Sequence, residues 1–271
     1  EIETNDFTYK GANIYINAII NEKSLEKLSF SINQLEIDEL VLLLDEKYQK
    51  YLKKISFSDL SIIGEYDGKN LVLEKFELNL QDNTKINLIG LIDLKNIFNS
   101  DLKISGRGIS SENILQLFRN LDLGLDTNVL PKGVLDYFSF NYQQKKINDI
   151  ELSYKSELGT NIIVKGDIEN SNLLDNFLSF EINSTSSEEI LEIIDKLFHS
   201  NLNSFQFDKL KLVSNLNRGI LNINSLNLSN RNSNTDVSGE IDIRNIENRK
   251  LKISTSNFNN FNLLPSSKFT D

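Results

Sequence analysis

The chain contains one sequence block twice, and this duplication is the feature that most constrains its fold. The segment Ile86–Asp93 is similar to Ile162–Glu169, and a second segment, Ser110–Phe118, is similar to Ser186–Ile194. In both pairs the second copy follows the first by 76 positions, so two separate landmarks keep one offset. A repeat of this length is a whole supersecondary unit, and repeated units build proteins in which each unit contacts mainly its neighbours.

Weaker copies lie on both sides of this central pair. Ala18 takes the place of Gly90, 72 positions earlier, and Gly239 takes the place of Gly166, 73 positions later. The copies therefore predict tandem repeats of about 72–76 residues. The predicted repeats are residues 1–54 (partial, with a helix), 55–121, 122–199 and 200–271. Because the chain has no Met and opens within the pattern, we expect it to be a fragment of a longer protein.

Most of each repeat alternates apolar and polar residues. Phe76, Leu78 and Leu80 fall on one side of a strand, and the polar residues between them fall on the other. The alternation recurs in residues 86–94, 162–168, 221–223, 241–243 and 251–253. A period of two is typical of strands with one apolar and one polar face. Short turns that contain Asp-Gly or Asn, such as Tyr66–Asn70, predict antiparallel hairpins in chain order.

A short helix is expected to close each repeat. Ser186 and Glu189 have the spacing of a capping box, and Ile190 begins an apolar helical stripe. Ser110 occupies the place of Ser186 in the preceding repeat. A longer helix with its N-cap at Asp38 is predicted in the first repeat. We interpret these helices as plugs of the apolar face at repeat boundaries, with docking of a partner as the alternative.

Composition excludes several classes of function. The net charge is −10 and the basic residues are scattered, which argues against a nucleic-acid surface and against electrostatic adhesion to an anionic membrane. No run of about 18 apolar residues and no signal peptide is present. The absence of Cys excludes disulfides and thiolate zinc sites.

The residues that usually carry catalysis are few, so we expect no enzyme, no cofactor and no metal site. His199 is the only histidine, and one histidine cannot supply a multi-histidine metal centre. Gly106 and Gly108 lack the third glycine and the βαβ context of a phosphate loop. The adjacent carboxylates Glu188 and Glu189 are expected on a solvated helix surface.

A sheet with one apolar face must bury that face, and the predicted helices are too short to cover it. A continuous sheet of this kind leaves an apolar trough, and exposed apolar area on such a scale indicates a binding surface. Acyl chains fit such a trough, so the inward apolar positions are the candidate lipid-groove residues. They are Phe76, Leu78, Leu80, Ile86, Leu88, Ile92, Ile162, Val164, Ile168, Ile241 and Ile243.

These patterns resemble a known family. Strands that end in Gly-x-Ile-Asp, as at Gly90–Asp93, are followed by a Leu-x-Ile strand and a short Leu/Ile-rich helix. This arrangement is similar to the AsmA-like repeat proteins of the bacterial envelope, including TamB-like and YhdP-like members. The resemblance covers nearly the whole chain but is one of pattern, because the family has no catalytic motif to match.

The resemblance implies a long β-groove that is hydrophobic inside. It implies a periplasmic location, anchored to the inner membrane by an N-terminal helix that this sequence does not contain. The implied partners are phospholipids or other acyl-chain lipids, moved in support of outer-membrane biogenesis and integrity. Which lipid moves, and in which direction, stays open.

Two alternatives remain beside a lipid conduit. The first is a structural or adhesive β-repeat module of a bacterial surface or envelope protein, with a sealed core. The second is a lipopolysaccharide-handling β-jellyroll, which would need shorter repeats and no helices between them.

Overall fold

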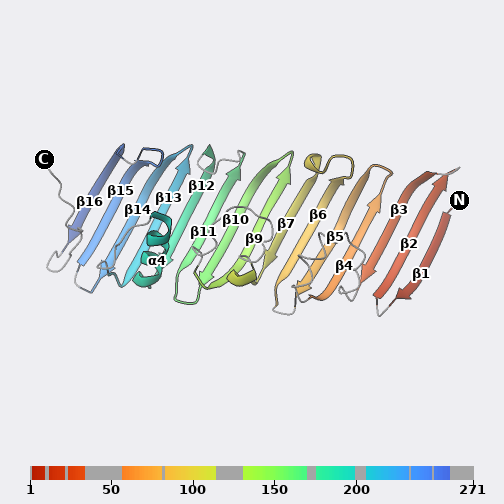
Figure 1. The fold of residues 1–271 in the computed structure, drawn as a ribbon, viewed down its shortest axis with the longest axis horizontal. Helices are drawn as coiled ribbons and strands as arrows, with labels where there is room; N and C mark the ends of the chain where they lie inside the picture. The colour runs from red at the N-terminus through yellow and green to blue at the C-terminus, as the bar shows by residue number, and fades with distance from the viewer. Residues whose placement is uncertain are drawn as a thin grey trace. The chain divides into compact units, whose positions relative to one another are not determined.

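The computed structural model describes residues 2–9, 12–21, 24–33, 57–80, 83–113, 131–169, 175–198, 206–231, 233–245 and 247–256. Sixteen strands in these residues form one sheet, in which strand order follows chain order from β1 to β16 and β8 pairs with β9 beside this path (Figure 1). The first and last strands do not pair with each other, so the sheet is open. The prediction of a mainly β protein with an antiparallel sheet is therefore confirmed.

The chain divides into two compact units, and the division runs through β9 and β10. Unit 1 comprises Glu1–Ile109 and Tyr137–Ile150, and unit 2 comprises Ser110–Asp136 and Glu151–Asp271. The four predicted repeat boundaries stay a prediction.

Unit 1 is built from hairpins that follow one another along the chain. Its elements are β1 (Ile2–Tyr9), β2 (Ala12–Asn21), β3 (Ser24–Asn33), β4 (Phe57–Tyr66), β5 (Asn70–Leu80), β6 (Lys85–Asp93), the short 3-10 helix η1 (Ile97–Asn99) and β7 (Asp101–Arg107). The short strand β8 (Ile109–Ser110) lies at its boundary, and β9 (Gly133–Gln143) and β10 (Lys146–Ser156) contribute to both units.

Unit 2 continues in the same way and adds one helix. Its elements are β11 (Asn161–Ile168), β12 (Phe177–Ser184), α4 (Ser187–Phe198), β13 (Lys209–Asn217), β14 (Ile220–Asn230), β15 (Ser233–Asp242) and β16 (Arg249–Ser256). Each strand from β11 to β16 pairs with the next in antiparallel register.

The turn between β4 and β5 illustrates how local sequence sets these hairpins. The carboxylate of Asp67 accepts hydrogen bonds from the backbone amides of Asn70 at 2.6 Å and Lys69 at 2.9 Å. Gly68 has a φ of 86°, a conformation that glycine adopts without steric cost. The hydrogen bonds from Asn70 and then Lys69 hold the pKa of Asp67 below its ordinary value. The hairpin predicted at this turn is confirmed.

Three glycines mark the same irregularity in three strands. Gly90 in β6, Gly166 in β11 and Gly239 in β15 have φ values of 131°, 142° and 138°. A Cβ atom would lie 2.2, 2.1 and 2.0 Å, respectively, from a carbonyl oxygen of the next strand. These positions therefore require glycine. Ala18, at the corresponding sequence position in β2, is not among the described residues with positive φ.

Bulges lie opposite two of these glycines. In β5 the register shifts between Leu73 and Phe76, and Leu73 is the partner of Gly90. In β14 the register shifts between Ile223 and Leu226, and Ile223 is the partner of Gly239. A bulge adds a residue to one strand and increases the local twist, and the facing glycine allows the close backbone approach.

Helix α4 begins at the predicted cap but not with the predicted partner. Ser186 Oγ accepts a hydrogen bond from the amide of Glu189 at 3.3 Å, so the N-cap is confirmed. A capping box also requires the amide of Ser186 to donate to the carboxylate of Glu189. That part of the prediction is wrong, because the amide of Ser186 donates to Ser184 Oγ at 3.0 Å. The carboxylate of Glu189 instead accepts a 2.7 Å hydrogen bond from Ser156 Oγ in β10.

The prediction that Glu189 is solvated is also wrong, since its side chain is buried while Glu188 is exposed.

The helix predicted from Asp38 and the single histidine, His199, lie outside the described residues. In the part of the chain that the structure describes, no helix is long and apolar enough to cross a membrane.

Candidate functional site

In unit 1, apolar side chains form an uninterrupted row across seven neighbouring strands. Register pairs each member with the next, and alternation places all of them on one face of the sheet. The unit 1 row is Ile14, Ile32, Ile62, Phe76, Leu88, Ile104 and Phe140. All seven side chains are half-buried. The row is therefore apolar surface that the strands themselves only partly cover.

Unit 2 has an equivalent row across six strands. The unit 2 row is Ile162, Ile182, Leu212, Leu226, Val237 and Ile253. The first five members are half-buried, and Ile253 on β16 is 63% exposed. We call the side of each unit that carries its row the apolar face.

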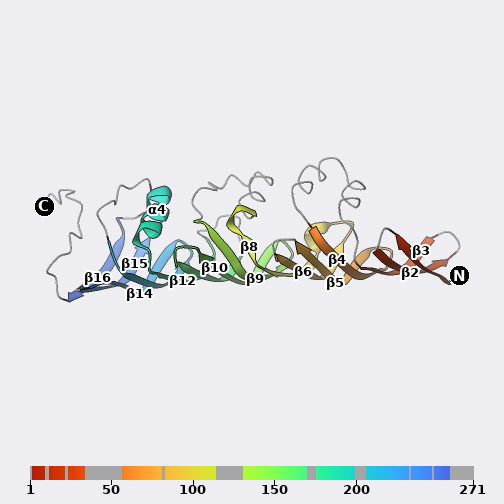
Figure 2. The ribbon, with the colours of Figure 1, turned by 90° about the horizontal axis from the view of Figure 1, so that it is seen from below.

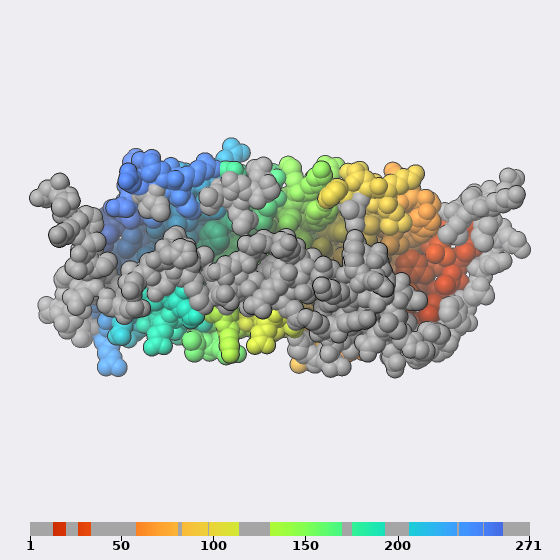
Figure 3. Space-filling view, viewed as in Figure 1, coloured from red at the N-terminus to blue at the C-terminus, as the bar shows by residue number. Residues whose placement is uncertain are grey.

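Helix α4 covers part of the apolar face of unit 2. Ile190 on α4 packs in one buried cluster with Phe207, Leu210 on β13 and Leu228 on β14. Ile182, Leu212 and Leu226 of the unit 2 row pack against this cluster. Figure 2 shows α4 on one side of these strands, and Figure 3 presents that same side in space-filling form. The helix therefore packs on this part of the apolar face.

The structure brings most of the predicted groove residues onto these faces. In unit 1, Phe76 is the partner of Leu88, and Leu78 is the partner of Ile86. Ile92 continues the same alternation, opposite Leu71. All of these side chains are half-buried.

In unit 2 the predicted residues lie on two strands of the same face. Ile162 and Val164 pair with Ile182 and Phe180 on β12. Ile241 pairs with Leu221 on β14. These predicted residues are half-buried.

Three predicted residues lie at or beyond strand ends. Leu80 and Ile168 are the last residues of β5 and β11. Ile243 lies one residue past β15, in a turn where its amide donates to the carbonyl of Gly219 at 2.9 Å. They therefore contribute less to the rows than the other predicted positions.

Sequence reasoning missed many members of the apolar faces. Some, such as Leu210 and Leu212, have the same period-two alternation and could have been found by it. Others lie before a bulge. Across a bulge, the residues of one face change from odd-numbered to even-numbered positions, or the reverse. Leu73 shares a face with Phe76 although three positions separate them, because the bulge inserts one residue.

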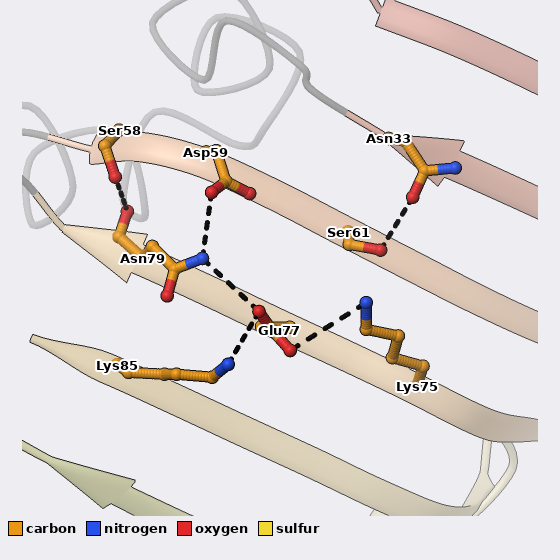
Figure 4. A network of polar contacts seen from close by, with 8 residues as sticks. All are labelled: Asn33, Ser58, Asp59, Ser61, Lys75, Glu77, Asn79 and Lys85. Atoms are coloured by element: carbon orange, nitrogen blue, oxygen red, sulfur yellow. Dashed lines mark hydrogen bonds and ion pairs between the residues drawn. The ribbon is translucent and has the colours of Figure 1, made fainter.

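The opposite face of unit 1 carries a network of polar contacts (Figure 4), although Tyr15, Val72 and Ile89 are exposed on it. Glu77 forms an ion pair with Lys85 on β6 at 2.7 Å, and Asn79 donates to Asp59 on β4 at 2.9 Å. The hydrogen bond from Lys85 is the main reason why the pKa of Glu77 lies below its ordinary value. Ion pairs of this exposure contribute at most about 1 kcal/mol each, so their main effect is to keep this face solvated and charge-matched.

The polar face of unit 2 carries a shallow hollow of about 620 Å³. Its lining includes Lys165, Ser179, Asn215 and Asn222, which are cross-strand partners on the face opposite the apolar row. The lining also includes Phe177, Leu178 and Leu216, so the hollow is mixed in character, whereas the two rows are apolar throughout. The apolar faces are therefore the candidate acyl-chain surface.

No group of three or more His, Cys, Asp or Glu side chains in the described part of the chain is arranged to hold a metal ion. No protein-family model, no curated protein and no solved structure matches this chain.

Proposed function

We propose that this chain is part of a non-enzymatic periplasmic β-groove that carries phospholipid acyl chains between the inner and outer membranes. In this role it supports outer-membrane biogenesis and integrity. The observation that carries the proposal is the uninterrupted apolar row across seven neighbouring strands of unit 1, all of them half-buried. The periplasmic location and a membrane anchor outside this sequence rest on the resemblance to the AsmA-like family.

The energetics of hydrocarbon transfer favour a conduit. Burial of a methylene group contributes about 0.8 kcal/mol, so a 16-carbon chain gains about 12 kcal/mol on leaving water. The chain has gained a similar amount in its bilayer. Transfer from bilayer to apolar face is therefore close to neutral, which suits movement better than tight binding.

We also infer that the fold consists of tandem repeats of about 72–76 residues, each closed by a short helix. The shared conformation of Gly90, Gly166 and Gly239 supports this inference. Equivalent turns support it further, because the amide of Leu80 donates to Thr84 O and the amide of Ser156, 76 positions later, donates to Thr160 O, each at 2.8 Å. A repeated unit extends the apolar face by the same increment each time.

A structural or adhesive β-repeat module is the second candidate, and one observation favours it. Ile190, Phe207, Leu210 and Leu228 are all less than 9% exposed, so α4 seals that part of the apolar face. If every repeat were sealed in this way, no trough would remain for lipid.

Lipid binding by matched charge variants separates the two candidates. Leu88→Asp places a carboxylate in the unit 1 row, whereas Asn87→Asp places one on the opposite face of the same strand. Because burial of a charge against hydrocarbon is costly, we expect Leu88→Asp to weaken binding of a fluorescent phospholipid by about tenfold or more. Asn87→Asp should bind like the unchanged protein.

Val164→Asp tests unit 2 in the same assay, and mass spectrometry of an organic extract tests for co-purified phospholipid. Circular dichroism and thermal melts must show that each variant is folded. Lipid binding that survives both Leu88→Asp and Val164→Asp in folded protein, with no lipid in the extract, would contradict the groove and favour the structural module.

A further inference from the structure

The hollow on the polar face of unit 2 lies over four consecutive strands, β11 to β14 (Figure 1). Its volume of about 620 Å³ falls in the range of about 300–1,000 Å³ that is typical of small-molecule sites. One residue from each strand forms a row across it, in register: Lys165, Ser179, Asn215 and Asn222. Because neighbouring strands lie about 4.8 Å apart, this row is about 14 Å long. The hollow therefore has room for an elongated ligand.

A bulge in β14 brings a further amide to the hollow. Val213 on β13 pairs with Ser225, and the next residue, Ser214, pairs with Ile223. Asn224 is skipped by this register, and it lines the hollow. Bulges of this kind re-aim a side chain and are frequent beside functional sites. The irregularity of β14 thus adds to the polar lining.

Four asparagine side chains line the hollow without a hydrogen-bond partner among the described residues. They are Asn215, Asn217, Asn222 and Asn224. Asparagines at other places on the polar faces do have partners, since each of the following donates to a carboxylate: Asn79, Asn141, Asn183 and Asn227. An amide side chain carries both N–H donors and a carbonyl acceptor. The hollow therefore presents an array of donors and acceptors to a ligand.

An aromatic ring lies beside these amides. Phe177 is the register partner of Asp167 and Asn217, so it shares their face, and its side chain is 40% exposed. The guanidinium of Arg218 lies 5.2 Å from the centroid of the ring. An exposed aromatic ring offers a flat apolar contact. The lining therefore combines one apolar platform with several amides.

The charges of the lining are balanced. Lys165 and Asp167 are its charged residues, one of each sign. Lys165 is already paired with Glu151 on β10. A phosphate or another anion would therefore find no uncompensated cation in the lining, and a neutral ligand suits it better.

We propose that this hollow binds a neutral oligosaccharide. Each sugar hydroxyl both donates and accepts hydrogen bonds, which matches the amides, and the C–H face of a sugar ring can pack on Phe177. A hydrocarbon tail would instead remove the amides from water without giving them partners. The site lies on the face opposite the unit 2 row, so it is independent of the proposed lipid transport.

Titration of the full chain with neutral trisaccharides tests the proposal. The probes are cellotriose, maltotriose and triacetylchitotriose, and the measurement is two-dimensional NMR of isotopically labelled protein, which resolves asparagine side-chain amides. We expect saturable binding of at least one probe, with the largest shifts in the amides that line the hollow. Sulfated cellotriose and a neutral peptide of alternating Ser and Ala are the comparison ligands, and both should bind more weakly.

Two double alanine variants provide a matched comparison. Asn215→Ala with Asn222→Ala removes two amides of the row, so binding should weaken by about tenfold, the effect of two lost hydrogen bonds. Asn161→Ala with Asn234→Ala removes two exposed amides from the same face outside the hollow and should leave binding unchanged. Phe177→Ala should also weaken binding, whereas Phe177→Tyr keeps the ring and should retain it.

Failure of all three trisaccharides to bind, or equal weakening by the two double variants, would overturn the proposal. Tighter binding of the sulfated sugar or of the peptide would also overturn it, since the hollow would then suit an anion or a polypeptide. Thermal melts show whether each variant is folded. The control removes the same number of amides, so a general loss of stability would affect both double variants.

Discussion

The two ends of strands β12 to β14 in unit 2 are stabilised in different ways. Near α4, Leu210 on β13 lies opposite Leu228 on β14, and both are buried beneath Ile190 of the helix. At the other end, Leu178 on β12 lies opposite Gly166 on β11, with no Cβ between the strands. One end depends on side-chain packing, and the other depends on close backbone approach.

This difference teaches how a sheet with one apolar face can be covered in one place and left open in another. A helix that packs on the face stabilises the strands and removes the apolar surface from solvent. A glycine opposite a neighbouring strand lets the two backbones pair closely and does not cover the face. The part of the face away from α4 is the part that the proposed function assigns to lipid.

The largest loss of stability is expected from Gly166→Ala. This substitution tests the end of the strands that depends on close backbone approach. The new Cβ would lie 2.1 Å from the carbonyl oxygen of Phe177, at a φ of 142° that L-residues avoid. We expect the free energy of unfolding to fall by about 3 kcal/mol or more, measured by urea denaturation. Ser179→Ala on the adjacent strand removes only a 3.3 Å hydrogen bond to Lys165 O and should cost less than about 1 kcal/mol. Equal losses in the two variants would contradict this account.

A pair of alanine variants compares covered and open parts of the apolar face. Leu228 is 6% exposed under α4, so Leu228→Ala should lower the free energy of unfolding by about 3 kcal/mol through lost burial and a cavity. Ile253→Ala, at a position 63% exposed, should cost less than about 1 kcal/mol. If the two losses are similar in urea denaturation, α4 does not cover the face in solution.

The smallest effect concerns Tyr154, which lies in β10 close to the start of α4. Its hydroxyl donates to the carbonyl of Pro131, and burial raises the pKa of Tyr154 to about 12, with the nearby charges of Glu189 and Glu157 adding to the rise. Below pH 10 the side chain is neutral in both folded and unfolded protein. Between pH 10 and pH 12 the unfolded chain loses this proton first, so stability should fall as pH rises.

Tyr154→Phe removes both the hydrogen bond and the titration. At pH 8 the variant should be less stable than the unchanged protein by about 1 kcal/mol. Its stability should fall less steeply between pH 10 and pH 12, so the difference should narrow there. Parallel stability curves over this range would mean that Tyr154 is not buried at the α4 end.

The sequence predicted the strands well because alternation reports directly which side of a strand faces water. Phe76, Leu78 and Leu80 lie in β5 with the predicted orientation, and the turn at Asp67 forms as expected. Alternation could not predict that Leu73 belongs to the same face, because a bulge depends on the neighbouring strand and not on local composition.

Glu189 shows a second limit. Its spacing from Ser186 suits a capping box, but tertiary packing brings Ser156 of β10 within 2.7 Å and the carboxylate bonds there instead. A local sequence pattern indicates which hydrogen bonds are possible within one segment. Which of them forms depends on residues that are distant in the chain.

The order of the strands has a consequence for biosynthesis. Since β1 to β16 pair in the order of translation, each hairpin can form as soon as its second strand leaves the ribosome. No early strand waits for a late one, and local pairing of this kind favours fast folding. During translation, each new strand can therefore pair with the strand that was made just before it.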